Sequence, residues 1–287
     1  MSAGNEQVTP PAELRVRVLD ASRQTRTPGR PAPDTPDISP VDAFSRQGHA
    51  FSATLSELDA AQWRQPVLRD LDVQGLVGHL TGVEEDMQRG LDGDPEVAQA
   101  DHVASTQPAA LRQAGRDPAQ TQAEWAQAAQ RTLARVRDVT DADAIVSVYN
   151  FPLPLSMWLV VRAFELWTHE NDIRRAADLP ASVPDPATLR LMTDLVAGVL
   201  PLAGAATGLD QPISLRLVLT GPGGGTWNVR FGQPDEEPAP LRIVTGAVGF
   251  CRLAANRAAP ADLDLDLAGD PEQAALVLAA ATTLGLD

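Results

Sequence analysis

The stretch that most restricts how this chain can fold is residues 155–177. It reads as one helix that is apolar on nearly every side, with Met157, Trp158 and Phe164 spread around it, so other helices must enclose it. One polar line nevertheless runs along this helix, at spacings of three, four and three residues: Arg162, Glu165, His169 and Asp172. Buried charge is costly unless it is paired or bound to a metal. The polar line therefore predicts a functional site inside a helical bundle.

Three further helices of similar length are predicted upstream. Ser39-Pro40 is a start signal for a helix to about Asp59, because a serine cap precedes a proline at the first helical position. A second helix begins near Asp70 or Asp72 and carries His79 beside its apolar stripe, and a third runs from Asp117-Pro118 to about Val139. Residues 90–116 lose the helical period and read as a long connection. Together with residues 155–177, these helices predict an antiparallel four-helix bundle.

The two ends of the chain differ from this helical part. Residues 1–38 hold one short amphipathic candidate, 12–22, followed by dense proline and glycine, which predicts an arm and linker. After residue 180 the pattern changes to mixed helices and strands. Helices are expected after Asp185-Pro186, over 246–257 and after Asp270-Pro271; strands are expected at 213–220, 226–231, 241–245 and around 263–267. The GPGGG run at 221–225 lies between two strands, which favours a hairpin over a phosphate-binding loop. We predict an arm (1–38), a four-helix bundle (39–180) and a small α/β domain (181–287).

Composition excludes several function classes. The net charge of −15 disfavours nucleic acid and anionic membranes as main partners, because both would be repelled. The chain has no lysine, which removes Schiff-base chemistry, and its single cysteine, Cys251, excludes an intrachain disulfide framework and a cysteine zinc cluster. With no run of about 18 apolar residues and no signal-like N-terminus, we expect a cytoplasmic protein.

A metal site is the sharpest hypothesis for the polar line. Glu165 and His169 are four residues apart and leave the same face of the helix. With His79 they make a set of two histidines and one carboxylate, the composition of open zinc and non-haem iron sites. The alternative is that Glu165 and His169 form a helical ion pair and His79 is unrelated. His49 and His102 have no partner pattern and read as surface residues, and Cys251 reads as a core residue.

Two stretches resemble the signatures of a known family: residues 72–80, ending His79-Leu80, and residues 165–174, which begin Glu165-Leu166-Trp167-Thr168-His169. They are similar to those of the mycothiol-dependent maleylpyruvate isomerase family, within the DinB-like four-helix bundles, and the resemblance covers roughly residues 40–287. It implies a divalent metal, usually zinc, held by His79, Glu165 and His169. It also implies a sterol-carrier-like C-terminal domain whose arginine binds the anionic substrate. The family often has Gly-Arg where this chain has Asn256-Arg257, so Arg257 is the candidate and Arg252 the reserve.

The resemblance leads us to expect a divalent-metal-dependent S-transferase or isomerase. Its cosubstrate would be mycothiol or a similar low-molecular-weight thiol, and its substrate a small, anionic electrophile. Asp172 is expected to orient His169; alternatively, Arg162 faces Asp172 as a structural ion pair. Two other functions stay open: a non-catalytic, metal-dependent protein that binds or senses a small molecule, and a polar line that is only an ion-pair network. We expect a monomer or homodimer with no nucleic-acid or membrane partner.

Overall fold

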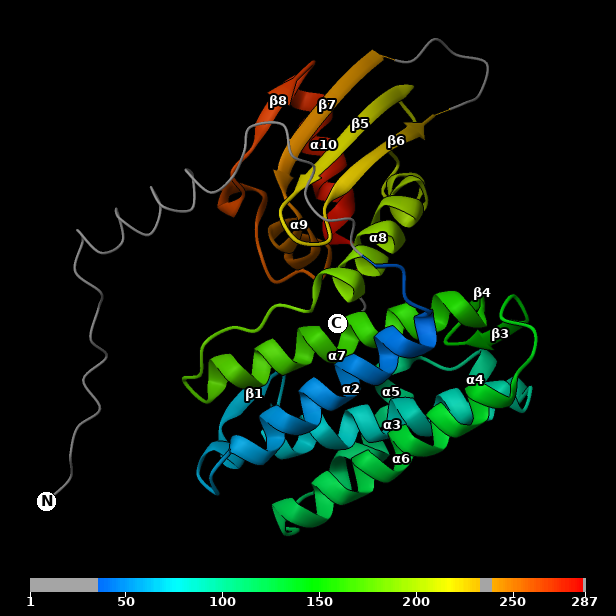
Figure 1. The fold of residues 1–287 in the computed structure, drawn as a ribbon, viewed down its shortest axis with the longest axis vertical. Coiled ribbons are helices and arrows are strands. Elements are labelled where there is room, and N and C mark those ends of the chain that lie inside the picture. Colours follow the sequence, from blue (N-terminus) through cyan, green and yellow to red (C-terminus); the bar gives the residue numbers. More distant parts are fainter. Residues whose placement is uncertain (1–35, 233–238, 286–287) are drawn as a thin grey trace, which may run out of the picture. The chain divides into compact units, whose positions relative to one another are not determined.

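The computed structural model describes residues 36–232 and 239–285. The chain divides into two units, Met1–Pro36 and Asp37–Asp287, and nearly all of the described residues belong to the second. The amphipathic segment expected at 12–22 lies outside the described residues. The fold class predicted from the sequence, a helical bundle followed by a small α/β part, is confirmed by the elements of the second unit (Figure 1).

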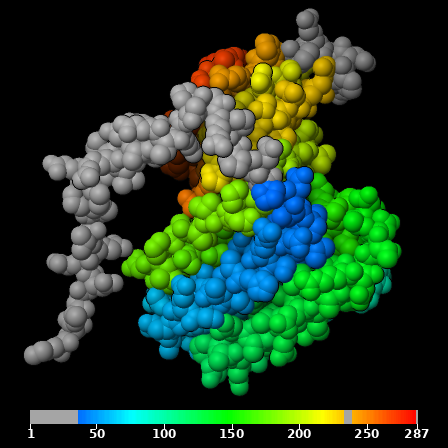
Figure 2. Space-filling model, viewed as in Figure 1, coloured from blue at the N-terminus to red at the C-terminus, as the bar shows by residue number. Residues whose placement is uncertain are grey.

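Four long helices make the helical part. They are α2 (Pro40–Glu57), α3 (Val73–Leu91), α6 (Pro118–Asp138) and α7 (Leu155–Ala176). Each of the first three starts at the cap expected from the sequence: the side chains of Ser39, Asp72 and Asp117 accept hydrogen bonds from backbone N–H groups of the first turn. Helix α2 contacts both α6 and α7. In Figure 2 its residues, in blue, lie beside green residues of the bundle.

Several short elements were not expected from the sequence. They are η1 (Gln62–Arg64), β1 (Pro66–Leu68), β2 (Leu71–Asp72), α4 (Pro95–Ala98), α5 (His102–Leu111), β3 (Ile145–Val148) and β4 (Phe151–Pro154). The prediction that residues 90–116 form only a connection is wrong, because α4 and α5 lie within it. Helix α5 buries Thr106, Ala109 and Ala110 rather than large apolar side chains, so it gives no hydrophobic period to read.

Two glycines of α3 explain why the weakly apolar helix α5 packs against α3. A Cβ atom at Gly78 would lie 2.6 Å from Gln113 Cγ and 2.9 Å from the backbone of Ala109. At Gly82 it would lie 3.0 Å from Ala109 Cβ and 3.1 Å from Thr106. Without these Cβ atoms the two helices approach closely, which places the start of α5 beside the inner face of α3.

The strands β3 and β4 form a two-residue hairpin that leads into α7. Val148 pairs with Phe151, and the two residues between them, Tyr149 and Asn150, have φ angles of 54° and 65°. Left-handed backbone at both positions is the pattern of a type I′ turn, although a tyrosine is unusual there. The Tyr149 hydroxyl donates a hydrogen bond to Asp86 at 3.0 Å, and its backbone N–H donates to Val97 O at 3.0 Å. These bonds hold the turn against α3 and α4.

The α/β part contains a four-stranded sheet in the order β6-β5-β7-β8, in which β5 and β7 are parallel and the other pairs antiparallel. The strands are β5 (Ile213–Thr220), β6 (Gly225–Phe231), β7 (Ala239–Gly246) and β8 (Asp266–Ala268). The predicted hairpin at 221–225 is confirmed by the antiparallel pairing of β5 with β6. The last strand is shorter than the alternation over 263–267 suggested. Buried and exposed residues alternate along β5, so helices cover one face of the sheet.

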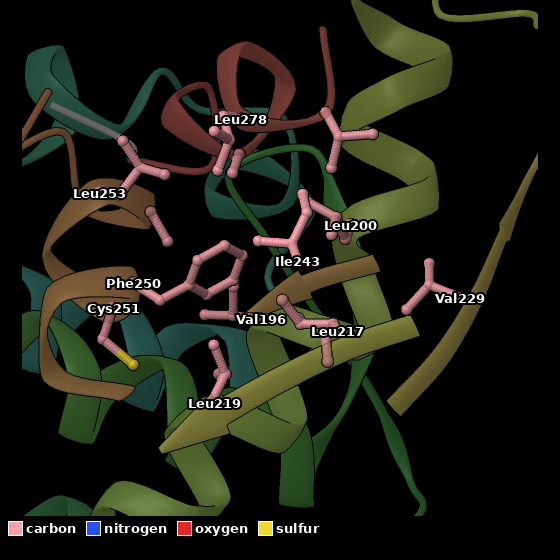
Figure 3. Close-up of a cluster of buried hydrophobic side chains, with 14 of the residues drawn as sticks. Val196, Leu200, Leu217, Leu219, Val229, Ile243, Phe250, Cys251, Leu253 and Leu278 are labelled. Carbon is pink, nitrogen blue, oxygen red and sulfur yellow. The ribbon is translucent and has the colours of Figure 1, made fainter. Parts of the chain in front are cut away.

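Helices α8 (Pro186–Ala206), α9 (Ala247–Ala254) and α10 (Pro271–Thr282) cover that face. Their apolar side chains meet those of β5 and β7 in one core, shown in Figure 3, where Phe250 and Cys251 lie beside Val196 and Leu219. Burial raises the pKa of the Cys251 thiol, as expected for the core residue that the sequence predicted. Helix α8 is the one described helix that is long and apolar enough to cross a membrane by length and composition. Its contacts with β6, α7, α9 and α10 account for that apolar composition.

The two parts pack against each other within one compact unit. Trp167 of α7 belongs to the core of the α/β part, and Arg46 of α2 forms an ion pair with Asp185, the cap of α8, at 3.0 Å. The boundary expected near residue 180 falls between α7 and α8, but the compact unit runs through it. The division into two domains therefore stays a prediction.

The close packing of α3 on α5 predicts opposite effects for two matched substitutions. Gly78→Ala should lower the free energy of unfolding by about 1–3 kcal/mol, because the added methyl group meets α5 backbone. Gly48→Ala, in α2 with no atom within 4 Å of the new Cβ, should raise it by about 0.5–1 kcal/mol. Urea unfolding followed by circular dichroism measures both. Equal stabilisation by the two changes would contradict the packing argument.

Candidate functional site

The polar line on α7 is buried, and its charged residues are paired. Arg162 is fully buried and donates hydrogen bonds to Glu84 Oε1 from Nη2 at 2.8 Å and from Nε at 3.3 Å, and it also donates to Glu165. Its two acidic partners outweigh the effect of burial and raise the pKa of the guanidinium. The alternative expectation, in which Arg162 faces Asp172 as an ion pair, is not what the structure shows. Arg162 instead joins α7 to α3 through Glu84.

Glu165 is held as a carboxylate that faces the histidines. Burial alone would raise the pKa of Glu165, but the Arg162 guanidinium outweighs it and the pKa lies well below its usual range. Oε1 lies 3.7 Å from His79 Nε2 and 3.5 Å from His102 Nε2. Among the described residues, Glu165 Oε1 and His79 Nε2 are buried atoms without a hydrogen-bond partner. Because such atoms cost about 1–3 kcal/mol each when nothing binds them, they indicate a ligand.

The tautomer of His79 follows from its neighbour. Thr106 Oγ1 lies 2.7 Å from His79 Nδ1 and 2.8 Å from the carbonyl oxygen of His102. A hydroxyl donates one hydrogen, and the backbone carbonyl can only accept, so Nδ1 of His79 carries the proton that Thr106 accepts. Burial also lowers the pKa of the His79 imidazole, with Glu165 acting in the opposite direction. His79 therefore presents a neutral ring with the Nε2 lone pair directed into the site.

His102 belongs to this site, contrary to its reading as a surface residue. It is the first residue of α5, its ring lies 5.0 Å from that of His79 and 4.6 Å from that of Tyr149, and its side chain is only 10% exposed. Ligand atoms of His79, His102 and Glu165 all lie within 4.8 Å of one another. Sequence reasoning missed His102 because α5 itself was missed. The other histidine read as a surface residue, His49, is exposed on α2.

His169 lies beside this cluster and is held from behind. Its ring packs edge-on against that of His79 with centroids 5.8 Å apart, and its Nδ1 lies 3.2 Å from Asp172 Oδ2. Asp172 in turn accepts hydrogen bonds from Arg257 Nη2 at 2.8 Å and Nε at 3.1 Å. Burial would raise the pKa of Asp172, but its bonds to His169 and Arg257 lower it. Asp172 thus lies between His169 and Arg257, and its role in orienting His169 stays a prediction.

Arg257 reaches Asp172 because α9 ends in a defined way. Asn256 has a φ of 55°, its N–H bonds Leu253 O at 2.9 Å, and the N–H of Arg257 bonds Arg252 O at 2.8 Å. This is a Schellman cap, whose left-handed residue is usually glycine and sometimes asparagine. Asn256 therefore stands where the resembled family often has glycine, without losing the turn that aims Arg257 at α7.

A cavity of about 390 Å³ opens beside these residues. His102, Glu165, His169 and Arg257 contribute to one part of its wall, and most of the remaining wall is apolar. Among the described residues that line the cavity, Arg257 is the one arginine. Arg252, the reserve candidate, is not a lining residue.

The residues present fit a divalent metal. Neutral imidazoles and a carboxylate suit zinc and iron, and a metal-binding histidine normally donates its other ring N–H to a neighbouring acceptor. His79 has Thr106 in that position and His169 has Asp172. His102 is closer to Glu165 than His79 is, but its Nδ1 is buried without a hydrogen-bond partner in the described part of the chain. By distance the compact set is His79, His102 and Glu165, whereas the outer hydrogen bonds favour His79 and His169, so the predicted ligand set of His79, Glu165 and His169 stays a prediction.

Comparisons with known proteins agree with this architecture. A model of the mycothiol maleylpyruvate isomerase N-terminal domain matches residues 44–174. Uncharacterized proteins from two strains of Mycobacterium tuberculosis, CDC 1551 and H37Rv, are each 26% identical over 241 residues, which covers 80% of this chain and 90% of the relative. The crystal structure of the mycothiol-dependent maleylpyruvate isomerase matches with a TM-score of 0.54 at 17% identity, over 79% of this chain and 91% of that one. A mutant of that enzyme gives a TM-score of 0.55 at 16% identity.

Arg162→Leu should destabilise the fold strongly. The substitution leaves Glu84 and Glu165 buried without their cation, which costs about 3–5 kcal/mol. The matched control is Arg242→Leu, since Arg242 forms an exposed pair with Asp266 at 3.3 Å, and its loss should change stability by about 1 kcal/mol or less. Urea unfolding in the presence of a chelator measures both without a contribution from metal. Similar losses of unfolding free energy in the two variants would show that the buried ion pair contributes no more to stability than the exposed one.

Proposed function

Because residues 44–174 match the model of the mycothiol maleylpyruvate isomerase N-terminal domain, we propose that this chain is a divalent-metal-dependent thiol S-transferase or isomerase. Its cosubstrate is mycothiol or a similar low-molecular-weight thiol, and its second substrate is a small electrophile. The observation that carries this proposal is the pair of buried, unsatisfied atoms, His79 Nε2 and Glu165 Oε1, which lie 3.7 Å apart, with Glu165 in the wall of a cavity.

His79, Glu165 and His169 are the proposed ligands, and zinc is the proposed metal. A bound divalent cation would supply Lewis acidity that stabilises a thiolate at neutral pH. Thr106 and Asp172 fix the two imidazoles from behind, so that both rings keep their orientation when the site is empty. Arg162 keeps Glu165 ionised, which a ligand oxygen requires.

The charges around the site favour an anionic cosubstrate. Arg162 balances Glu84, and Arg257 balances Asp172. Glu165 is then the one unbalanced carboxylate among these five residues, so two positive charges from a metal exceed it by one. A site with one excess positive charge, away from water, stabilises a thiolate over a neutral thiol.

His102 is proposed to carry a proton rather than to bind the metal. Within the part of the chain that the structure describes, its Nδ1 has no hydrogen-bond partner of the kind that His79 and His169 have, and His102 lines the cavity. Nε2 of His102, beside Glu165, is placed to take the proton of an incoming thiol and to return it to the substrate carbon. A base at this position is expected to contribute about 10²–10⁴-fold to the rate.

Asp172 and Arg257 are proposed to support the site together by holding His169 in place. Asp172 orients His169, and Arg257, which was expected to hold a substrate carboxylate, fixes Asp172 and contributes to the cavity wall. We propose that the protein works in the cytoplasm as a monomer or homodimer.

A second candidate function is a metal-dependent binding or sensing protein without turnover. The mainly apolar cavity supports it, because such a cavity can sequester a ligand without chemistry. Consumption of mycothiol together with an electrophile distinguishes the enzyme from the sensor.

Metal binding provides the first test. The purified protein should hold one divalent metal with micromolar or better affinity, and His79→Ala should lose at least about 10²-fold of that affinity, since one of three ligands is removed. The matched control is His49→Ala, an exposed histidine that should leave affinity unchanged. Competition with a chromophoric chelator measures all three proteins. A wild-type protein that binds no metal would end the enzyme proposal.

His102→Gln separates proton transfer from ligation. If His102 carries a proton, the variant should bind metal within about threefold of wild type and lose about 10²–10⁴-fold in turnover of mycothiol with an electrophile. The spectrum of the cobalt-substituted protein should also stay unchanged, because its ligand set is the same. A loss of metal affinity comparable to that of His79→Ala would instead make His102 a ligand.

A further inference from the structure

We propose that the cavity beside the histidines receives an uncharged, apolar alkyl or aryl group of the electrophile. This inference rests on the proposed function for the reacting end of the molecule and goes beyond it in naming the class of group that the rest of the site takes. It departs from the small, anionic substrate expected from the sequence.

The walls of the cavity are mainly apolar. Fifteen of the 22 residues that line it are alanine or larger apolar residues. Helix α7 contributes Met157, Val161 and Phe164 on one side, and α8 contributes Leu195 and Val199 on the other. Burying each methylene against such a surface favours binding by about 0.8 kcal/mol, whereas a carboxylate placed there would lose its hydration without a partner.

The charged side chains in the lining favour an uncharged ligand group over a carboxylate. Among the described residues Glu165 is the one carboxylate in the lining, and its cation, Arg162, does not line the cavity, so this pair offers no positive charge to a substrate carboxylate. Arg257 is the one lining cation among the described residues, and its nitrogen atoms are engaged within the protein: Nε and Nη2 donate to Asp172, and Nη1 donates to Ala255 O at 3.0 Å. A substrate carboxylate would have to compete with the buried Asp172 carboxylate for this guanidinium.

The cavity extends from the histidines to exposed apolar side chains. Its polar part is formed by His102, Glu165 and His169, and Phe151 and Leu202, which also line it, are 45% and 69% exposed. An apolar group seated there would place its reactive carbon near the thiol-binding residues, while these two side chains extend the apolar surface to the solvent. A volume of about 390 Å³ lies within the range of small-molecule sites. A polar, water-soluble thiol gains little binding free energy from apolar walls, so we assign these walls to the electrophile.

Turnover of matched acrylamides with mycothiol tests the inference. In this addition the sulfur bonds to the terminal alkene carbon, the C=C double bond becomes single, and the thiol proton goes to the adjacent carbon. From N-methyl- to N-butyl- to N-hexylacrylamide, kcat/KM should rise by up to about fourfold for each buried methylene. The acid of the same carbon-chain length, 6-acrylamidohexanoate, should react at least about tenfold more slowly than N-hexylacrylamide, relative to their uncatalysed rates. A flat series, or a preference for the acid, would overturn the inference.

Binding of unreactive analogues separates this inference from the proposed function. N-hexylpropanamide should bind the protein in calorimetry at least about tenfold more tightly than 6-propanamidohexanoate, whether or not metal and thiol are present. If it does so and no acrylamide is turned over, the cavity assignment stands and the enzyme proposal falls. If acrylamides are turned over but the two propanamides bind equally, the cavity assignment falls alone.

Two leucines on helix surfaces provide matched variants. Leu202→Asp places a carboxylate at the exposed edge of the cavity, and Leu276→Asp does so on α10, outside the lining, where Leu276 is 43% exposed. The first should weaken N-hexylpropanamide binding at least about fivefold and the second should not change it. Val199→Ser, deeper in the wall, should weaken binding in the same direction, with melting temperatures recorded for all three. Equal binding by the Leu202 and Leu276 variants would show that the ligand sits elsewhere.

Discussion

The buried ion pair of Arg162 with Glu84 and Glu165 is the interaction on which the rest of the site depends. It joins α7 to α3 at a place where both helices are otherwise enclosed by apolar side chains. A guanidinium without solvent needs both carboxylates, and Glu165 needs the guanidinium to stay ionised. The same pair therefore fixes the relative position of two helices and maintains the charge of the residue proposed as the oxygen ligand.

Two further contacts complete the geometry around this pair. The glycines at 78 and 82 let α5 approach α3, which delivers Thr106 behind His79 and His102 beside it. From the other side, the end of α9 delivers Arg257 to Asp172, behind His169. His79 is thus held by a residue of another helix, and His169 by Asp172 of its own helix, which Arg257 in turn fixes. A metal bound by these residues would find a site whose shape is set by packing and hydrogen bonds and not by the metal alone.

The site has two chemically different halves. One is polar and compact, with charges that nearly cancel, and suits the handling of a thiol. The other is an apolar cavity between α7 and α8 whose walls offer contact area but little directional bonding. In the proposed function, reaction type depends on the first half and substrate choice on the second. The wall residues are separate from the buried pair, so a substitution in the wall can change the cavity without disturbing that pair.

Sequence alone determined the long helices, their caps, the mixed α/β tail and the polar line from Arg162 to Asp172, because caps and helical periods are local signals that neighbouring residues carry. It also placed His79 among the candidate ligands. Only the tertiary structure decided that His102 is in the site, that Arg162 pairs with Glu84, and that Arg257 bonds Asp172. These are contacts between residues 60 to 85 positions apart, set by how closely helices pack and where a helix ends, and no local pattern in the chain records them.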